Sequence, residues 1–245
     1  MSLIIGTAGW SIPGKDAGFF DEEGSSLQRY ATRFRGVEVN SSFYHPHRRT
    51  TWTRWGDSVP PQFRFAVKVP ETITHQQKLM DCEDLLDKFL EEVSGLGSKL
   101  AVLLVQLPPK LGFEAPVASD FFAMLSSRTA AKVACEPRHM SWFESNAESV
   151  LRGLKVARVG ADPALTQRAS MPGAWPRLRY WRLHGSPVMY RSDYDAARLA
   201  EYGNALLTEH EAGQDVWCMF DNTAASAATS NALALSSQLG ISHSR

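Results

Sequence analysis

The stretch Ala134-Cys135-Glu136-Pro137-Arg138-His139-Met140-Ser141-Trp142 begins as a short apolar strand and then presents an acid, two bases and a large aromatic ring. A surface loop has little reason to gather these side chains, whereas a strand end beside a ligand has one. We interpret residues 134–142 as one wall of a ligand site. The stretch also guides the fold prediction, because its pattern recurs along the chain.

Seven of eight expected strands run directly into a polar side chain. The expected strands cover residues 3–7, 37–40, 63–69, 100–107, 132–136, 155–162, 179–185 and 215–220, each a short apolar or alternating run. The polar residues at their ends are Asn40, Lys68, Gln106, Glu136, Asp162, His184 and Asn222. The pattern predicts that residues distant in sequence converge at one end of a sheet.

Most of these strands are separated by segments with helical spacing of apolar residues. Helices are expected over residues 27–34, 81–95, 117–126, 147–153, 196–211 and 224–239. Residues 41–61 read as a long connection with one short helix, and residues 163–176 as a stretch without one. Alternating strands and helices indicate a parallel sheet. Eight such units in 245 residues favour a single-domain, irregular (β/α)8 barrel of the TIM type over residues 1–245, with an open doubly wound sheet as the alternative.

Composition narrows the class of protein. The chain has 44% hydrophobic residues, and its 26 basic side chains balance 26 acidic ones, which gives no net charge to steer a nucleic acid or an anionic membrane. The widely spaced Cys82, Cys135 and Cys218 read as free thiols in a reducing cytoplasm. No apolar run approaches the ~20 residues that span a bilayer. We therefore expect a soluble, cytoplasmic protein.

Several sequence blocks resemble the YecE-like family, a domain of unknown function with a TIM-barrel-like fold. The blocks are 6–11 (GTAGWS), 37–44 (VEVNSSFY), 65–68 (FAVK) with Thr74-His75, 106–109 (QLPP), 136–142 (EPRHMSW), 180–185 (YWRLHG) and 220–222 (FDN). They follow one another from the first expected strand to the last. The resemblance implies the barrel fold and a motif-rich mouth, but no reaction. Asp221 departs from the family pattern, where asparagine is usual, and adds a negative charge to this mouth.

The polar residues at the strand ends suggest acid–base chemistry on a small anionic substrate, phosphate-like or carbohydrate-like, without a redox cofactor. Glu136 and His139 are the predicted proton-transfer groups, with His184 as a third catalytic candidate. Arg138, Arg182 and Lys68 are the predicted anion clamp. The remaining predicted substrate-binding residues are Asn40, Tyr44, His75, Gln106, Trp142 and Asn222.

Each of these residues could instead have a structural role. For the inward carboxylate Glu38, a buried ion pair with Arg182 or Lys68 is favoured over catalysis. Each cation of the clamp could pair with an acid inside the site, and the histidines could hold loops. The aromatic candidates for flat walls, which serve equally as packing, are Trp10, Tyr44, Trp142 and Tyr180.

Three further functions stay open. A divalent metal could bind mixed carboxylate and imidazole ligands, although no ligand-pair spacing marks such a site; the residues concerned are Glu136, His139, Asp162, His184 and Asp221. The protein could instead bind single-stranded nucleic acid, or bind a ligand without catalysis. The sequence has no phosphate-binding, dinucleotide, serine-hydrolase or zincin motif, which disfavours those classes of enzyme.

Overall fold

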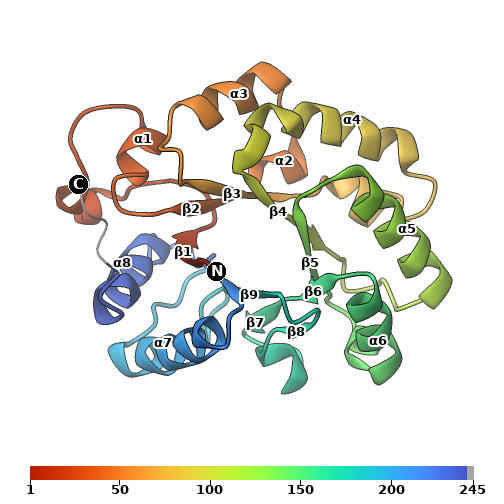
Figure 1. The fold of residues 1–245 in the computed structure, drawn as a ribbon. Coiled ribbons are helices and arrows are strands. Elements are labelled where there is room, and N and C mark those ends of the chain that lie inside the picture. The colour runs from red at the N-terminus through yellow and green to blue at the C-terminus, as the bar shows by residue number, and fades with distance from the viewer. Residues whose placement is uncertain (242–245) are drawn as a thin grey trace.

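Strands and helices alternate along most of the chain in the computed structural model, which describes residues 1–241 (Figure 1). The strands are β1 (Leu3–Thr7), β2 (Gly36–Val39), β3 (Arg64–Lys68), β4 (Leu100–Gln106), β5 (Lys132–Glu136), β6 (Val156–Arg158), β7 (Gly160–Asp162), β8 (Gly173–Ala174), β9 (Leu178–Leu183) and β10 (Asp215–Phe220). All eight expected strands are present. The one expected over residues 155–162 is divided into β6 and β7.

The helices lie close to their expected positions. They are α1 (Ser26–Tyr30), α2 (Ser41–Tyr44), α3 (Arg49–Asp57), α4 (Glu83–Val93), α5 (Ala115–Arg128), α6 (Ser145–Gly153), α7 (Ala196–Glu211) and α8 (Ala228–Gln238). The connection over residues 41–61 holds two helices rather than one. The expected helices at 27–34 and 224–239 are shorter than predicted. No helix within residues 1–241 is both long enough and apolar enough to cross a membrane.

Within the described residues the strands form two hydrogen-bonded sheets. One has the order β1-β10-β9-β7 and the other the order β2-β3-β4-β5-β6-β8. Every strand pair is parallel except β6 with β8. Figure 1 shows the strands of both sheets curving around a shared interior, with the helices outside them. The fold is therefore a mixed α/β fold built on parallel sheets.

The predicted closed barrel is not confirmed, because the pairing of strands is interrupted at two places in residues 1–241. Strand β6 pairs with β5 and β8, whereas the next strand, β7, pairs with β9 of the other sheet. At the opposite junction, β1 and β2 are joined only by an isolated bridge between Ala8 and Glu38. The expected strand at 155–162 is divided because its two halves belong to different sheets.

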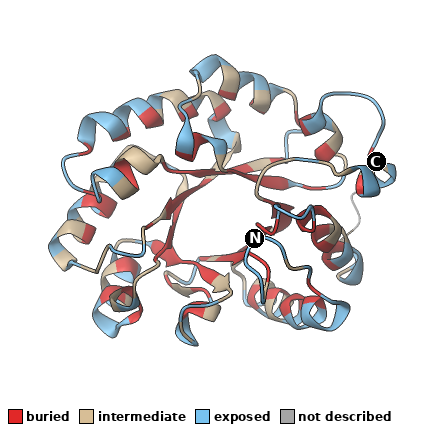
Figure 2. Cartoon of the chain, turned by 180° about the vertical axis from the view of Figure 1, so that it is seen from behind, coloured by how far each residue is buried: buried red, intermediate tan, exposed pale blue. Residues whose placement is uncertain are grey.

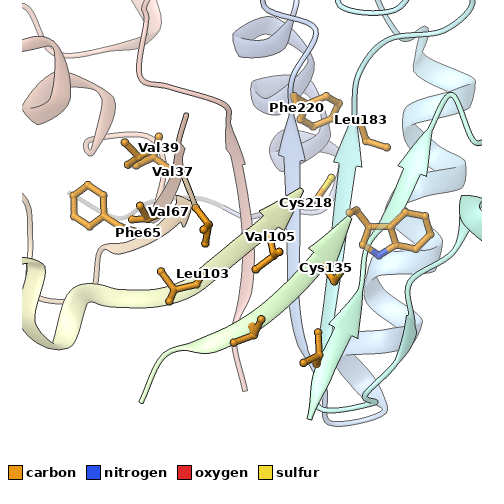
Figure 3. Close-up of a cluster of buried hydrophobic side chains, with 14 of the residues drawn as sticks. Val37, Val39, Phe65, Val67, Leu103, Val105, Cys135, Leu183, Cys218 and Phe220 are labelled. Atoms are coloured by element: carbon orange, nitrogen blue, oxygen red, sulfur yellow. The ribbon is translucent and has the colours of Figure 1, made fainter. Parts of the chain in front are cut away.

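Side chains on the two faces of the strands enter two separate hydrophobic clusters. Alternation with a period of two directs Phe65 and Val67 of β3 into the cluster drawn in Figure 3, while Ala66 between them enters the other. Val37 and Val39 likewise lie in the cluster of Figure 3. Figure 2 shows the strands buried and the outward faces of the helices exposed. Polar residues of the inner face are therefore enclosed by the sheets.

The junction of β1 and β2 depends on two glycines. A Cβ added to Gly6 would collide with the Gly36 carbonyl oxygen and lie 3.0 Å from the Tyr30 hydroxyl oxygen. That hydroxyl accepts a hydrogen bond from the Thr7 amide at 2.9 Å and donates one to the Gly36 carbonyl at 3.2 Å. Because the obstructing carbonyl is backbone, it cannot rotate away. Gly6 is required for the close approach of the two strands.

We predict that Gly6→Ala lowers the free energy of unfolding by about 2 to 3 kcal/mol, because the added methyl group overpacks a junction made of backbone. Urea denaturation followed by circular dichroism measures this loss. Gly153→Ala is the matched control, since its Cβ would meet no atom within 4 Å. Equal free energies of unfolding for the two variants would contradict the requirement for glycine at position 6.

Candidate functional site

The Arg182 guanidinium is the centre of a buried ion network that joins both sheets. Its Nη2 lies 2.7 Å from Glu38 Oε1, and its Nε lies 3.1 Å from Glu38 Oε2, which is bidentate pairing. Its Nη1 lies 2.5 Å from Glu136 Oε2. The same Nη2 also lies 2.9 Å from Oδ2 of Asp221, which directly follows β10. One cation thus pairs with acids from β2, β5 and the end of β10.

The imidazole of His184 lies between two of these acids. Its Nδ1 is 3.0 Å from Asp221 Oδ2, and its Nε2 is 2.9 Å from Glu136 Oε1. The Arg138 Nη2 lies 3.1 Å from the same Nε2 and 2.7 Å from Glu136 Oε1. Both ring nitrogens therefore have a charged partner, and His184 has no exposed surface.

The network keeps Glu136 and Asp221 ionised. Burial raises the pKa of Glu136, but Arg182, Arg138 and His184 outweigh burial and hold this pKa well below its ordinary value. The pKa of Asp221 is lowered in the same way, with Arg182 and His184 opposing the effect of burial. Burial lowers the pKa of Arg182, but the acids around it, Glu136 first, more than compensate and raise it. Glu136 is therefore a fixed carboxylate, which is suited to accepting hydrogen bonds and not to donating a proton.

Lys68 is a buried cation that has no acid partner. Its side chain follows the inner face of β3 and only 6% of the residue is exposed. Its Nζ lies 3.9 Å from the centre of the Phe43 ring, and no acid of residues 1–241 is within 4.0 Å of it. Burial, followed by the charge of Arg182, lowers the pKa of Lys68 to about 8, although nearby acids counteract this in part. Burial of the Lys68 ammonium therefore costs desolvation free energy, and no ion pair in the described residues offsets this cost.

A cavity of about 190 Å³ opens beside the network. Glu136 and Arg138 form its polar part. The rest of its lining is mostly apolar: Pro137, Phe143, Val159, Ala161, Pro163, Ala164, Leu165, Ala169 and Met189. The Arg138 side chain is 20% exposed and also contacts His184. Arg138 therefore connects the cavity to the buried histidine.

Other predicted substrate-binding residues lie near strand ends. His75 packs edge-on against Phe43 with ring centres 5.0 Å apart, and burial, followed by the charge of Lys68, lowers its pKa. Asn40 and Asn222 each have a buried side-chain oxygen without a hydrogen-bond partner in the part of the chain that the structure describes. Gln106 is half-buried and pairs in register with Glu136. Tyr44 is exposed and contacts the Phe43 ring.

Three predicted roles need correction. Arg182 is not available as an anion clamp, because its guanidinium is occupied by three acids. Trp142 is not a wall of the site: it is buried in the core, and its Nε1 donates to the Leu111 carbonyl at 2.9 Å. His139, a predicted proton-transfer group, is engaged in a helix cap: its Nδ1 accepts from the Ser141 amide at 3.3 Å, at the start of the short helix Met140–Phe143.

Sequence reasoning did not assign Asp221 or Phe43 to the site. Asp221 was noted only as an added charge and as a metal ligand, yet it holds both Arg182 and His184. Its position directly after β10 was the available signal. Phe43 gave no signal, because only the fold brings its ring against Lys68. In residues 1–241 no group of three or more His, Cys, Asp or Glu side chains is arranged to hold a metal ion.

These features define an α/β protein whose charged residues from several parallel strands meet at the carboxyl ends of those strands. The sequence profile of the family described as "Protein of unknown function DUF72" matches residues 4–245, and the chain belongs to this family.

The chain is also similar to individual members of this family. The UPF0759 protein YecE of Escherichia coli K12 is 34% identical over 133 residues, which are 53% of this chain and 48% of YecE. The UPF0759 protein YunF of Bacillus subtilis strain 168 is 27% identical over 154 residues, 58% of this chain and 52% of YunF. The chain thus spans about half the length of the curated relatives it matches.

Solved structures of the family share the fold. A DUF72 family protein from Enterococcus faecalis V583 aligns with a TM-score of 0.81 and 21% identity, covering 97% of this chain and 95% of that one. A DUF72 family protein from Thermotoga maritima MSB8 aligns with a TM-score of 0.79 and 21% identity, covering 98% of this chain and all of that one.

We predict that Arg182→Met lowers the free energy of unfolding by about 3 to 5 kcal/mol, because it leaves buried carboxylates without their cation. Chemical denaturation at pH 7 measures the effect. Arg179→Met is the control on the same strand; Arg179 is half-buried and pairs with Glu209 at 3.3 Å. A loss at Arg182 no larger than that at Arg179 would show that the network does not hold the sheets together.

We predict that Lys68→Met is more stable than the wild type at pH 7, by on the order of 2 kcal/mol. The pKa of Lys68 is about 8 in the folded protein and about 10.4 when unfolded, so the folded state disfavours the charged form. The destabilisation is complete below pH 8 and is relieved as pH rises towards 10. The difference between the variants, from urea titrations at pH 7 and pH 10, should therefore shrink. A destabilised Lys68→Met at pH 7 would contradict this.

Proposed function

We propose that this protein is an enzyme that binds a small anionic molecule at the carboxyl ends of its strands and moves a proton on it. The proposal includes an open, TIM-like barrel arrangement of the two sheets, with the site at its mouth. The anion is phosphate-like or carboxylate-like, and Lys68 and Arg138 are its binding groups. Catalysis, substrate and partner are all parts of the proposal.

Lys68 is the observation that carries the proposal. Folded proteins pair buried charges or neutralise them, and an unpaired buried ammonium lowers stability. Such a residue in a polar site is typical of ligand binding, because the ligand supplies the missing opposite charge. Arg138 adds a second cation, which is partly exposed and lines the cavity. In the proposal, Lys68 and Arg138 together supply the positive charge that an anionic ligand needs.

His184 is the proposed proton-transfer group, in place of Glu136. With a proton on Nδ1 only, Nδ1 donates to Asp221, and Nε2 can accept from Arg138. With a second proton on Nε2, the ring donates to Glu136 as well. Nε2 therefore has a hydrogen-bond partner in either protonation state, Arg138 when it carries no proton and Glu136 when it carries one, and the ring exchanges one partner for the other as the proton moves.

Arg138 couples binding to this proton transfer in the proposed mechanism. Its Nη2 contacts His184 Nε2, and its side chain also lines the cavity. A ligand anion that pairs with Arg138 draws the guanidinium towards the cavity and leaves Nε2 facing the ligand. Glu136 and Asp221 keep the ring in place, and Arg182 keeps both acids ionised. Arg182 is thus a positioning residue for His184.

We predict that inorganic phosphate and small phosphorylated or carboxylated metabolites raise the melting temperature of the wild type in a fluorimetry screen. A ligand at 100 times its dissociation constant stabilises the protein by about 2.7 kcal/mol. Lys68→Met and Arg138→Gln should abolish the shift, because each removes one binding cation. Lys110→Met, at an exposed position, should keep it. An unchanged shift in both site variants would place the anion elsewhere.

Turnover distinguishes an enzyme from a ligand-binding protein. Metabolites that stabilise the protein are incubated with it, and their conversion is followed by NMR. His184→Gln should lower the rate by about 100-fold or more, as removal of an acid–base group does. The shift caused by phosphate should persist in this variant. Stabilisation without conversion of any ligand would support the non-catalytic alternative.

A further inference from the structure

The amine of Lys68 contacts an aromatic ring, and this setting bears on its reactivity as well as on its charge. Its Nζ lies over one ring, Phe43, whose centre is 3.9 Å away. The half-buried His75 ring packs against the same phenyl group, and its Nδ1 is 2.9 Å from Thr74 Oγ1. The amine therefore ends against the Phe43 ring, with no acid of the described residues within ion-pair distance. An amine in such a setting is weakly solvated and keeps its lone pair accessible when it loses a proton.

Two half-buried lysines of the described residues have evident structural partners, and Lys68 does not. Lys99 Nζ donates to the carbonyls of Gly56 at 2.5 Å and Val59 at 2.6 Å. Lys132 pairs with Asp215. Lys68 is less exposed than either, yet its Nζ makes no hydrogen bond or ion pair within the described residues. A role in holding the fold does not account for it.

We propose that Lys68 Nζ forms a covalent imine with the carbonyl carbon of a small anionic carbonyl compound, of which a 2-oxo acid is the simplest example. The inference rests on the proposed function, because the anion site around Arg138 would hold the acid group of the compound. It narrows the substrate class from small anions to anions that carry an aldehyde or ketone.

The covalent step balances without any other reactant. The lone pair of the neutral amine attacks the carbonyl carbon, a carbon–nitrogen bond forms, and the carbonyl π electrons move to oxygen. The two protons of the amine are transferred to that oxygen, which leaves as water while the carbon–nitrogen double bond forms. The products are one imine and one water. Hydrolysis reverses the step and returns the lysine.

The ionisation of Lys68 supports this chemistry. With a pKa of about 8, about one tenth of the side chain is neutral amine at pH 7. An exposed lysine with an ordinary pKa of about 10.4 is neutral in fewer than about one in a thousand molecules. Lys68 is therefore enriched in the nucleophilic form by more than about 100-fold. Surface lysines serve as an internal reference in the same protein.

Reductive trapping tests the imine directly. The wild-type protein is incubated with pyruvate and cyanoborohydride at pH 7, and the adduct is located by peptide mass spectrometry. We expect one adduct per chain, on Lys68, formed at least 10-fold faster than on the exposed Lys110. Lactate, which has no carbonyl, should give no adduct. Acetone, which has no acid group, should modify Lys68 more slowly than pyruvate does.

Each outcome is decisive. Modification spread over surface lysines with Lys68 unmodified, in a protein that phosphate still stabilises, overturns the imine and leaves the proposed function intact. An adduct on Lys68 whose formation is suppressed by phosphate supports both the imine and the proposed function. An adduct on Lys68 without any stabilisation by phosphate supports the imine and overturns the anion site. Lys68→Arg, which keeps the charge but lacks the primary amine, should lose the adduct, and wild-type peptide mapping remains valid if this variant does not fold.

Discussion

The contact of one guanidinium with three carboxylates is the interaction on which the rest of this structure depends. Arg182 lies on β9 of one sheet, and its acids Glu38 and Glu136 lie on β2 and β5 of the other. Backbone pairing between the sheets is sparse, so the ion network supplies a link that the hydrogen-bonded ladders lack. A buried cation repays its desolvation only with good geometry and several partners, and Arg182 has both.

This network also sets what the neighbouring groups can do. Because Arg182 pairs with Glu136 and Asp221, these acids are occupied, and Lys68 has no acid partner among the described residues. The charges of Lys68, Arg138 and Arg182 equal those of the three acids when His184 is neutral. For the proposed anionic ligand, this balance means that binding would add net negative charge to the site.

The fold was largely predictable from the sequence, and the site only in part. Apolar runs and helical spacing located the strands, because these patterns depend on neighbours in the chain. The exchange of sheets between β6 and β7 depends on strand pairing, which leaves no local pattern. Two of the polar residues predicted to converge at the strand ends, Glu136 and His184, lie 2.9 Å apart. The capping contact of His139 was not predictable, since adjacency in sequence does not show whether a side chain faces the site or caps a helix.

The sequence also did not show which partner each buried cation contacts. The sequence predicts that Arg182 and Lys68 both belong to the site, and nothing in their types says which one contacts acids. Only the folded arrangement of the strands places Arg182 among three carboxylates and Lys68 against the Phe43 ring. The same geometry that pairs Arg182 with three acids leaves Lys68 without an acid partner among the described residues. Cohesion of the sheets and the unpaired charge of Lys68 are thus two results of one arrangement of charges.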